Sequence, residues 1–154
     1  TDAARAAIGD AGITPDDIDV VLVQSLLPDA LLIKDATAIC HALGIRKAAA
    51  WNVDSVCTSA LAQAQLGAAM ITAGQARHVL CVQSVAYSRV VNKNTSLWLM
   101  IGDMASAFVL AKKKGARFIN LLHVVAPADI EDGVHANGRG QAAIAEAVWT
   151  GLQR

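Results

Sequence analysis

One cysteine, Cys57, stands where the hydrophobic pattern changes from that of a strand to that of a helix. Residues 48–53, AAAWNV, predict a short strand, and residues 57–74 predict a long helix of small residues that ends at Gly74. A thiol is a good nucleophile only as a thiolate, which a helix start favours through its unpaired backbone N–H groups and its dipole. Those N–H groups can also hold the oxyanion that forms on a thioester carbonyl. Cys57 is therefore a candidate nucleophile, with a small buried core residue as the alternative.

The other reactive side chains complete neither a catalytic nor a metal site. Cys40 falls mid-helix on an apolar face and Cys81 falls mid-strand, so both are expected in the core. Three widely spaced cysteines fit neither a disulfide framework nor a metal pattern, and we expect no metal and no bound cofactor. A cysteine enzyme normally needs a base, usually histidine. Nothing marks one of the four histidines as that base: His41, His78, His123 and His135.

A second local motif is IGDMASAFVL at residues 101–110, where Gly102 and Asp103 precede small residues and then a strand. This order is typical of a tight turn whose backbone passes close to another group. It is not a phosphate-binding loop, because the chain contains neither GxGxxG nor GxxxxGK[ST].

Strands that alternate with helices must position these residues. The pattern predicts an α/β fold with a mainly parallel mixed sheet covered by helices. Segments 105–111 and 116–126 should form an antiparallel edge through the KKKG hairpin. We expect one domain over residues 1–126, followed by a loop and a helix over 127–154. The remaining expected elements are helices over 2–12 and 34–44, strands over 18–25 and 77–85, and a helix over the last fifteen residues.

Composition narrows the class of protein. The chain has 154 residues, of which 55% are hydrophobic and 17% charged, as suits one globular domain with a large core. The formal net charge is zero and no basic stripe is visible, which argues against a nucleic-acid partner. No apolar run reaches the ~18 residues of a membrane span, and we expect a reducing, cytoplasmic setting. Both ends read as helix, so we expect a piece of a longer polypeptide.

In order and spacing, these segments resemble the N-terminal half of a β-ketoacyl-acyl-carrier-protein synthase III, a family of the thiolase superfamily. ICHALGIRKAAAWNVDSVCTSALAQAQLGAAMITAG is similar to the segment through its nucleophile helix, with Cys57 at the position of the active cysteine. GQARHVLCVQSV is similar to its next strand, which ends in a Ser-like residue, here Ser84. IGDMASAFVLA is similar to its GDGAGA turn, so that Gly102 and Asp103 would support the cysteine. AARAAIGDAGITPDDIDVVLV is similar to its first helix, turn and strand.

The resemblance implies one half of a five-layer αβαβα fold and an acyltransferase with a ping-pong reaction. Cys57 would take an acyl group from a coenzyme A or acyl-carrier-protein thioester and pass it to a second substrate. The family's assisting His and Asn come from a C-terminal half, which we expect in the same or another chain. A homodimer is also implied, in which the strand over 77–85 would pair across the two-fold axis.

At several positions the sequence differs from the family pattern, and these differences narrow the predicted function. Thr95 stands where coenzyme-A-primed members carry an Arg for the nucleotide, and Leu32 where a Phe reaches into the partner's acyl pocket. Met104 and Ser106 replace glycines of the family's GDGAGA turn. After the cysteine, where the family often has Ala-Gly-Phe, this chain has Thr58, Ser59 and Ala60. The resemblance implies a place in fatty acid or polyketide biosynthesis. These changes argue against acetyl-CoA-primed fatty acid initiation and favour a diverged member that moves an unusual acyl group in secondary metabolism, with carbon, oxygen and nitrogen acceptors all open. The alternatives are a non-catalytic thiolase-like partner that shapes a dimer and an unrelated structural α/β domain.

Overall fold

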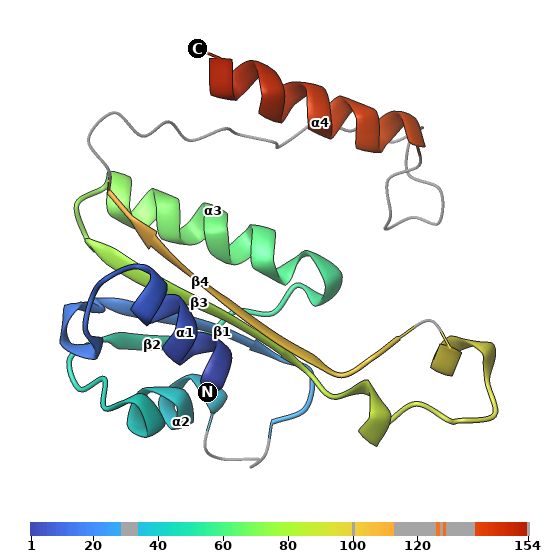
Figure 1. Ribbon diagram of the computed structural model, residues 1–154, viewed down its shortest axis with the longest axis horizontal. Helices are drawn as coiled ribbons and strands as arrows, with labels where there is room; N and C mark the ends of the chain where they lie inside the picture. The colour runs from blue at the N-terminus through green and yellow to red at the C-terminus, as the bar shows by residue number, and fades with distance from the viewer. Residues whose placement is uncertain (29–33, 100, 113–125, 127, 129–137, 154) are drawn as a thin grey trace. The chain divides into compact units, whose positions relative to one another are not determined.

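The computed structural model describes residues 1–28, 34–99, 101–112, 126, 128 and 138–153 (Figure 1). The chain divides into two compact units, Thr1–Lys112 and Lys113–Arg154. In the second unit, helix α4 spans Gly138–Gln153 and confirms the expected C-terminal helix. The expected strand over 116–126 lies almost wholly outside the described residues, and the domain boundary at 126 stays a prediction. No helix in the described part of the chain is long and apolar enough to cross a membrane.

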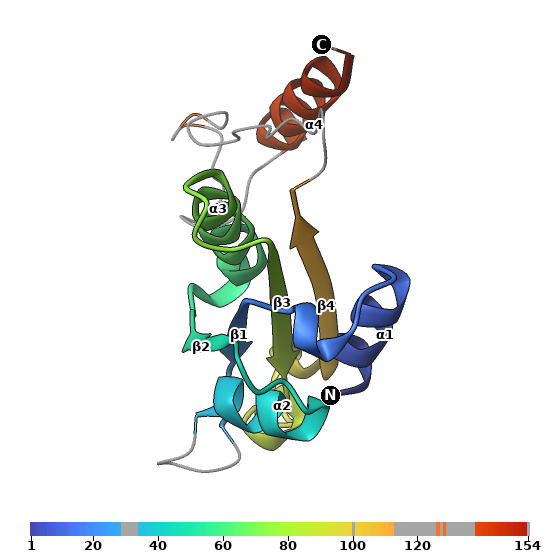
Figure 2. The same cartoon turned by 90° about the vertical axis from the view of Figure 1, so that its left-hand side faces the viewer.

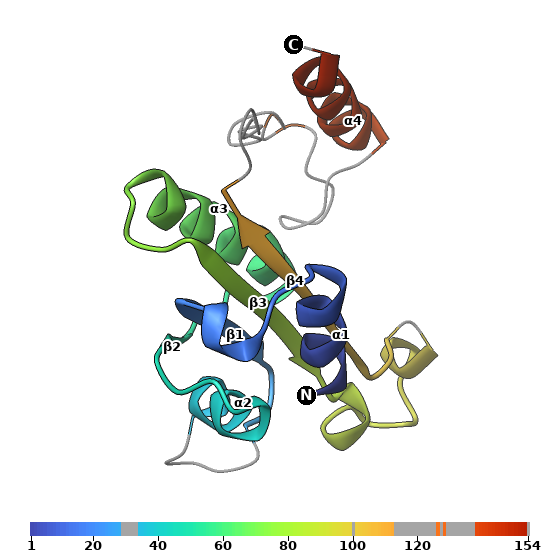
Figure 3. The ribbon, with the colours of Figure 1, turned by 60° about the vertical axis from the view of Figure 1, so that its left-hand side comes forward.

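The first unit is built on a four-stranded sheet with the order β2-β1-β3-β4. Strand β1 pairs in parallel with β2 and β3, and β4 runs antiparallel to β3 (Figure 3). This confirms the mainly parallel sheet with an antiparallel edge. Helix α1 precedes β1, α2 links β1 to β2, and α3 links β2 to β3. The bounds are α1 Asp2–Asp10, β1 Val20–Ser25, α2 Asp35–Leu43, β2 Ala49–Asn52, α3 Ser59–Thr72, β3 His78–Val85 and β4 Met104–Ala111.

Helices cover both faces of this sheet, because side chains along β1 and β3 alternate between the two faces (Figure 2). Val21 and Leu80 pack among α1 and α2 residues, whereas Leu22 and Cys81 pack against α3. The thiols of Cys40 and Cys81 are buried in these two cores, as expected. Burial raises the pKa of Cys40 and raises that of Cys81 to about 12, so both are protonated at neutral pH.

The position of β3 corrects one expectation. Pairing of the strand over 77–85 across a two-fold axis is wrong, because both edges of β3 are already hydrogen-bonded within the chain, to β1 and to β4 (Figure 3). A strand has only two hydrogen-bonding edges, so β3 has none left for a second copy. The edges of the described sheet are β2 and β4, and the homodimer itself stays a prediction.

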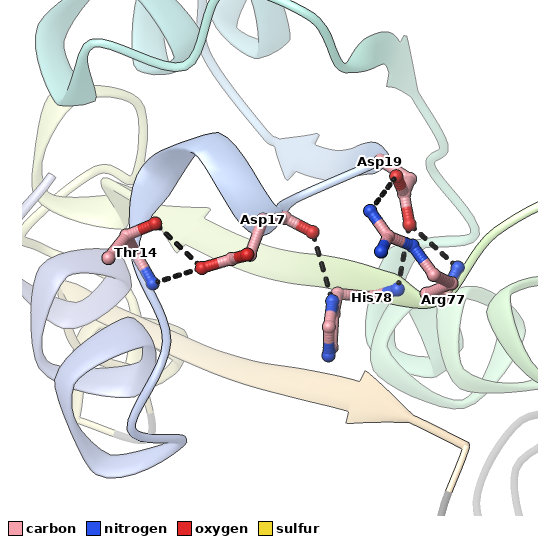
Figure 4. A network of polar contacts seen from close by, with 5 residues as sticks. All are labelled: Thr14, Asp17, Asp19, Arg77 and His78. Carbon is pink, nitrogen blue, oxygen red and sulfur yellow. Dashed lines mark hydrogen bonds and ion pairs between the residues drawn. The ribbon is translucent and has the colours of Figure 1, made fainter.

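A polar network ties the start of β1 to the start of β3 (Figure 4). Asp19 Oδ2 accepts the backbone N–H groups of Arg77 at 2.7 Å and His78 at 3.1 Å, and the guanidinium of Arg77 lies 3.6 Å from Asp19 Oδ1. Burial opposes ionisation, but these donors outweigh it and hold the pKa of Asp19 below its usual range. Nearby, the hydroxyl of Thr14 donates to Asp17 Oδ2 at 2.6 Å, and His78 Nδ1 lies 2.9 Å from the Asp17 carbonyl oxygen.

Gly67 lets α3 approach the sheet closely, and this contact can be tested. A Cβ at Gly67 would lie 2.7 Å from Leu110 Cδ1 and 3.1 Å from Val79 Cγ1, whereas one at Gly9 in α1 would meet nothing within 4 Å. We expect Gly67→Ala to lower the free energy of unfolding by about 1 kcal/mol, because overpacking exceeds the gain in helix propensity. Gly9→Ala should raise it by about 0.5 kcal/mol. Denaturant unfolding measures both, and an equal gain from the two would contradict the close packing.

The Asp19 network predicts an acid dependence of stability. Because the pKa of Asp19 is lowered in the folded state, its contribution is complete above the ordinary carboxyl pKa and disappears as the pH falls through the lowered value. We expect Asp19→Asn to be less stable than the wild type at pH 7 and to lose less stability between about pH 4 and pH 2.

Asp16→Asn is the matched control for this acid dependence. Asp16 is exposed, and its carboxylate has no hydrogen-bond partner among the described residues. Unfolding midpoints in urea across this pH range provide the measurement. Parallel acid curves for Asp19→Asn and the wild type would show that the carboxylate does not stabilise the fold through its charge.

Candidate active site

Cys57 lies in the short turn that connects the sheet to α3. Strand β2 ends at Asn52, a 3-10 turn spans Val56–Thr58, and α3 begins at Ser59, which confirms the expected strand-to-helix junction. The Cys57 side chain is exposed, whereas Cys40 and Cys81 are buried. Of the three thiols, Cys57 is the one that a dissolved substrate can reach.

The backbone beside Cys57 is strained and held by local hydrogen bonds. Val56 has a φ of 51°, the one non-glycine residue with positive φ in the described ranges. This left-handed conformation is a genuine outlier for a β-branched residue. Asp54 Oδ1 accepts the Val56 N–H at 2.8 Å. Ser59 Oγ donates to the Val56 carbonyl at 2.7 Å and accepts the Ser55 N–H at 2.8 Å. These contacts fix the chain on both sides of the thiol.

Cys57 also lines a cavity of about 260 Å³ between the turn and the ends of the strands. Gln24 of β1, Gln83 of β3 and Ser106 of β4 contribute to its floor, and Tyr87 contributes to its wall. None of the described residues that line the cavity carries a charge. A reachable thiol therefore faces a neutral, partly polar cavity.

A chain of buried amides connects α3 to this floor. Gln63, which is 0% exposed, donates from Nε2 to the carbonyl of Val53 at 3.1 Å and, at the long limit of 3.5 Å, to that of Val82. Its Oε1 accepts from Gln83 Nε2 at 2.7 Å, and Gln83 Oε1 accepts from the Ser106 hydroxyl at 2.9 Å. The sequence analysis missed both glutamines, although the triplet VQS occurs at 23–25 and again at 82–84, where the two copies pair in register.

Asp103 holds part of the cavity wall. Its carboxylate accepts the backbone N–H of Ser88 at 2.8 Å and the Ser88 hydroxyl, and these two hydrogen bonds lower the pKa of Asp103. They fasten the turn Tyr87–Arg89, whose Tyr87 lines the cavity, to the residue before β4. The role of Asp103 in supporting Cys57 stays a prediction. At Gly102, a Cβ would meet nothing within 4 Å among the described residues, so the expected close approach is not found.

Two other predicted residues, Ser84 and Thr95, are not among the residues that line the cavity of Cys57. Ser84 lies on the opposite face of β3 and lines a separate cavity together with Asp35. Thr95 is exposed, and its hydroxyl donates to the Asn92 carbonyl at 2.7 Å. Leu32 lies outside the described residues. The roles proposed for these three residues stay predictions.

No described histidine lines the cavity of Cys57. His41 is exposed on α2, and His78 contacts Asp17 at the far end of β3. His123 and His135 lie outside the described residues. Among the side chains that the structure describes, no three potential metal ligands come together. The described residues thus place an exposed thiol at a cavity that no described histidine lines.

Comparisons with known proteins agree with this geometry. The model of the family described as 3-oxoacyl-[acyl-carrier-protein (ACP)] synthase III matches residues 51–129, just over half of the chain. The β-ketoacyl-[acyl-carrier-protein] synthase III of Sinorhizobium medicae is 36% identical over 115 residues, which cover 74% of this chain and 36% of that protein. The enzyme of the same name from Anaplasma marginale is 32% identical over 144 residues, covering 90% and 44%.

A solved structure shows the same fold. The priming β-ketosynthase from the R1128 polyketide biosynthetic pathway superposes with a TM-score of 0.69 at 28% identity, over 72% of this chain and 34% of that one. The chain therefore has the fold of one half of a thiolase-like enzyme. It spans less than half the length of the relatives that it matches.

The strained turn can be tested through Val56, whose side chain is 66% exposed. Because asparagine tolerates the left-handed conformation better than valine, we expect Val56→Asn to raise the free energy of unfolding by about 1 kcal/mol. The control is Leu61→Asn on α3, another exposed apolar residue but with helical backbone, which should lower it by about 0.5 kcal/mol. Denaturant unfolding compares the two. A loss of stability in Val56→Asn would mean that packing of the valine outweighs the strain.

Proposed function

Because this chain belongs to the 3-oxoacyl-[acyl-carrier-protein] synthase III family, we propose that Cys57 accepts an acyl group from a thioester and passes it to a second substrate. The observation that carries the proposal is the exposed thiol of Cys57, held at a strand-to-helix turn beside a cavity. The donor is a coenzyme A or acyl-carrier-protein thioester. The names of the matched relatives support a place in fatty acid or polyketide biosynthesis.

The reaction proceeds in two half-reactions. In the first, the thiolate of Cys57 attacks the thioester carbonyl, and the resulting oxyanion is stabilised by N–H groups at the helix start. The bond between the carbonyl carbon and the donor sulfur then breaks, and the donor leaves as a thiolate that takes up the proton given up by the Cys57 thiol. In the second, a nucleophile of the second substrate attacks the acyl-cysteine and releases the Cys57 thiolate. Carbon, oxygen and nitrogen nucleophiles all satisfy this scheme.

The groups that move protons are proposed to lie in a complementary half of the fold, in the same or another chain. A homodimer and an acyl carrier protein are the further proposed partners. Three cysteines without disulfides suit a reducing, cytoplasmic setting.

Acylation of Cys57 is the direct test of this proposal. We expect the complete gene product, incubated with acetyl-, butyryl- or malonyl-coenzyme A, to gain the mass of one acyl group, which peptide mapping places on Cys57. Cys57→Ala should gain none. Cys40→Ala is the matched control and should keep the adduct, because the Cys40 thiol is buried and protonated.

Two other outcomes would argue against this role of Cys57. Absence of an adduct with every thioester would contradict the proposal. A Cys57→Ala protein that retained full activity in its complete assembly would instead favour a non-catalytic partner subunit.

A further inference from the structure

A row of polar side chains crosses the sheet face that α3 covers. Gln24 of β1 pairs in register with Gln83 of β3, which pairs in register with Ser106 of β4. Register partners point to the same face of a sheet, so the three side chains stand next to one another. The neighbouring rows of this face are apolar: Leu22, Cys81 and Phe108 on one side, Val85 and Met104 on the other. The polar row lies in the floor of the cavity of Cys57.

Backbone contacts fix the direction of the hydrogen bonds in this row. Gln63 must present its Oε1 to Gln83, because its Nε2 donates to the carbonyls of Val53 and Val82. Gln83 must then donate from Nε2, which leaves its Oε1 to accept the hydroxyl proton of Ser106. One N–H of Gln83 and the lone pairs of Ser106 remain for a ligand.

Gln24 is the unusual member of the row. Its side chain is only 4% exposed, and among the described residues it has no hydrogen-bond partner. Its amide atoms are nevertheless not among the fully enclosed unpaired atoms, so its residual exposure lies at the amide, in the cavity that it shares with Cys57. A buried amide without a hydrogen-bond partner lowers the stability of the fold. A ligand that pairs with this amide therefore supplies the missing hydrogen bond, which favours its binding.

The cavity limits the chemistry of that ligand. A carboxylate would find no counter-charge among the described lining residues, and an alkyl group would leave Gln24 unpaired. A hydroxyl group both donates and accepts, so it can pair with either the carbonyl oxygen or the NH2 group of Gln24. The volume of about 260 Å³ lies just below the usual range for ligand pockets, as suits a short chain.

We propose that the acyl group loaded onto Cys57 is a short hydroxyacyl group, whose hydroxyl is hydrogen-bonded by Gln24 beside Gln83 and Ser106. This inference rests on the proposed function of Cys57 and adds the substrate class. Gln24 acts as a specificity-determining residue, and the chain from Ser106 to Gln63 holds the neighbouring amide in place.

The test measures the rate at which the complete gene product acquires each acyl mass on Cys57. The donors are N-acetylcysteamine thioesters of 3-hydroxybutyrate (each enantiomer), butyrate and malonate. We expect the better 3-hydroxybutyryl enantiomer to load at least about tenfold faster than butyryl or malonyl, because a site built to pair a hydroxyl rejects analogues that lack one.

Gln24→Met tests the contribution of the Gln24 amide, because it removes the amide and keeps a side chain of similar size. This variant should load 3-hydroxybutyryl roughly tenfold more slowly while butyryl loading is unchanged or faster, and its thermal midpoint should rise because the unpaired amide is gone. The matched control is Gln65→Met on the exposed face of α3, which should keep the wild-type rates and preference.

Each other outcome overturns the inference. Equal or faster loading of butyryl or malonyl by the wild type overturns the hydroxyacyl class while leaving acylation of Cys57 intact. An unchanged preference in Gln24→Met overturns the role of that amide, and the wild-type series decides alone if the variant does not fold. Absence of any adduct overturns the proposed function together with this inference.

Discussion

The close packing of α3 on the sheet is the constraint on which the site depends. Gly67 allows the helix to lie against Val79, and Gln63 bonds from the same helix to backbone carbonyls beside β2 and within β3. With the helix axis fixed at these points, the turn at its start has one position, and Cys57 is placed over the ends of the strands. A change in helix depth would move Cys57 and Gln63 together relative to the cavity floor on the strands.

Stability and reactivity are divided between different parts of this unit. Continuous apolar runs such as Val20–Val23 fill both faces of the sheet, and Asp19 closes the end of the sheet remote from the cavity. Two unfavourable features lie near Cys57: the left-handed backbone of Val56, and the amide of Gln24, which has no hydrogen-bond partner among the described residues. Cores that tolerate such features commonly support functional sites, where strain and unsatisfied groups are retained for binding or chemistry.

The sequence was sufficient to predict the described helices and strands and the turn that holds Cys57. Hydrophobic periodicity and glycines at helix ends depend on local structure, which a single sequence records. The sequence was insufficient to predict the order of the strands across the sheet, since an apolar strand such as β3 suits a central position as well as a covered edge. The sequence also could not show on which face of β3 the Ser84 side chain lies, because a shift of one residue moves a side chain to the opposite face of a sheet. The amides of Gln24 and Gln83 were missed because they become neighbours only through the register of β1 with β3. The two residues are 59 positions apart in the sequence, from 24 to 83.

The contrast among the three thiols has a consequence for chemical damage. Cys40 and Cys81 are enclosed within the two cores, whereas Cys57 is exposed. Peroxide or an electrophile from the surroundings therefore meets a single exposed thiol, and the two core thiols are shielded while that thiol is modified. A sulfenic acid at Cys57 would block the acyl transfer proposed for this thiol without disturbing the two cores, and a thiol reductant would reverse the modification. The exposure on which the proposed function depends thus also leaves Cys57 open to oxidants.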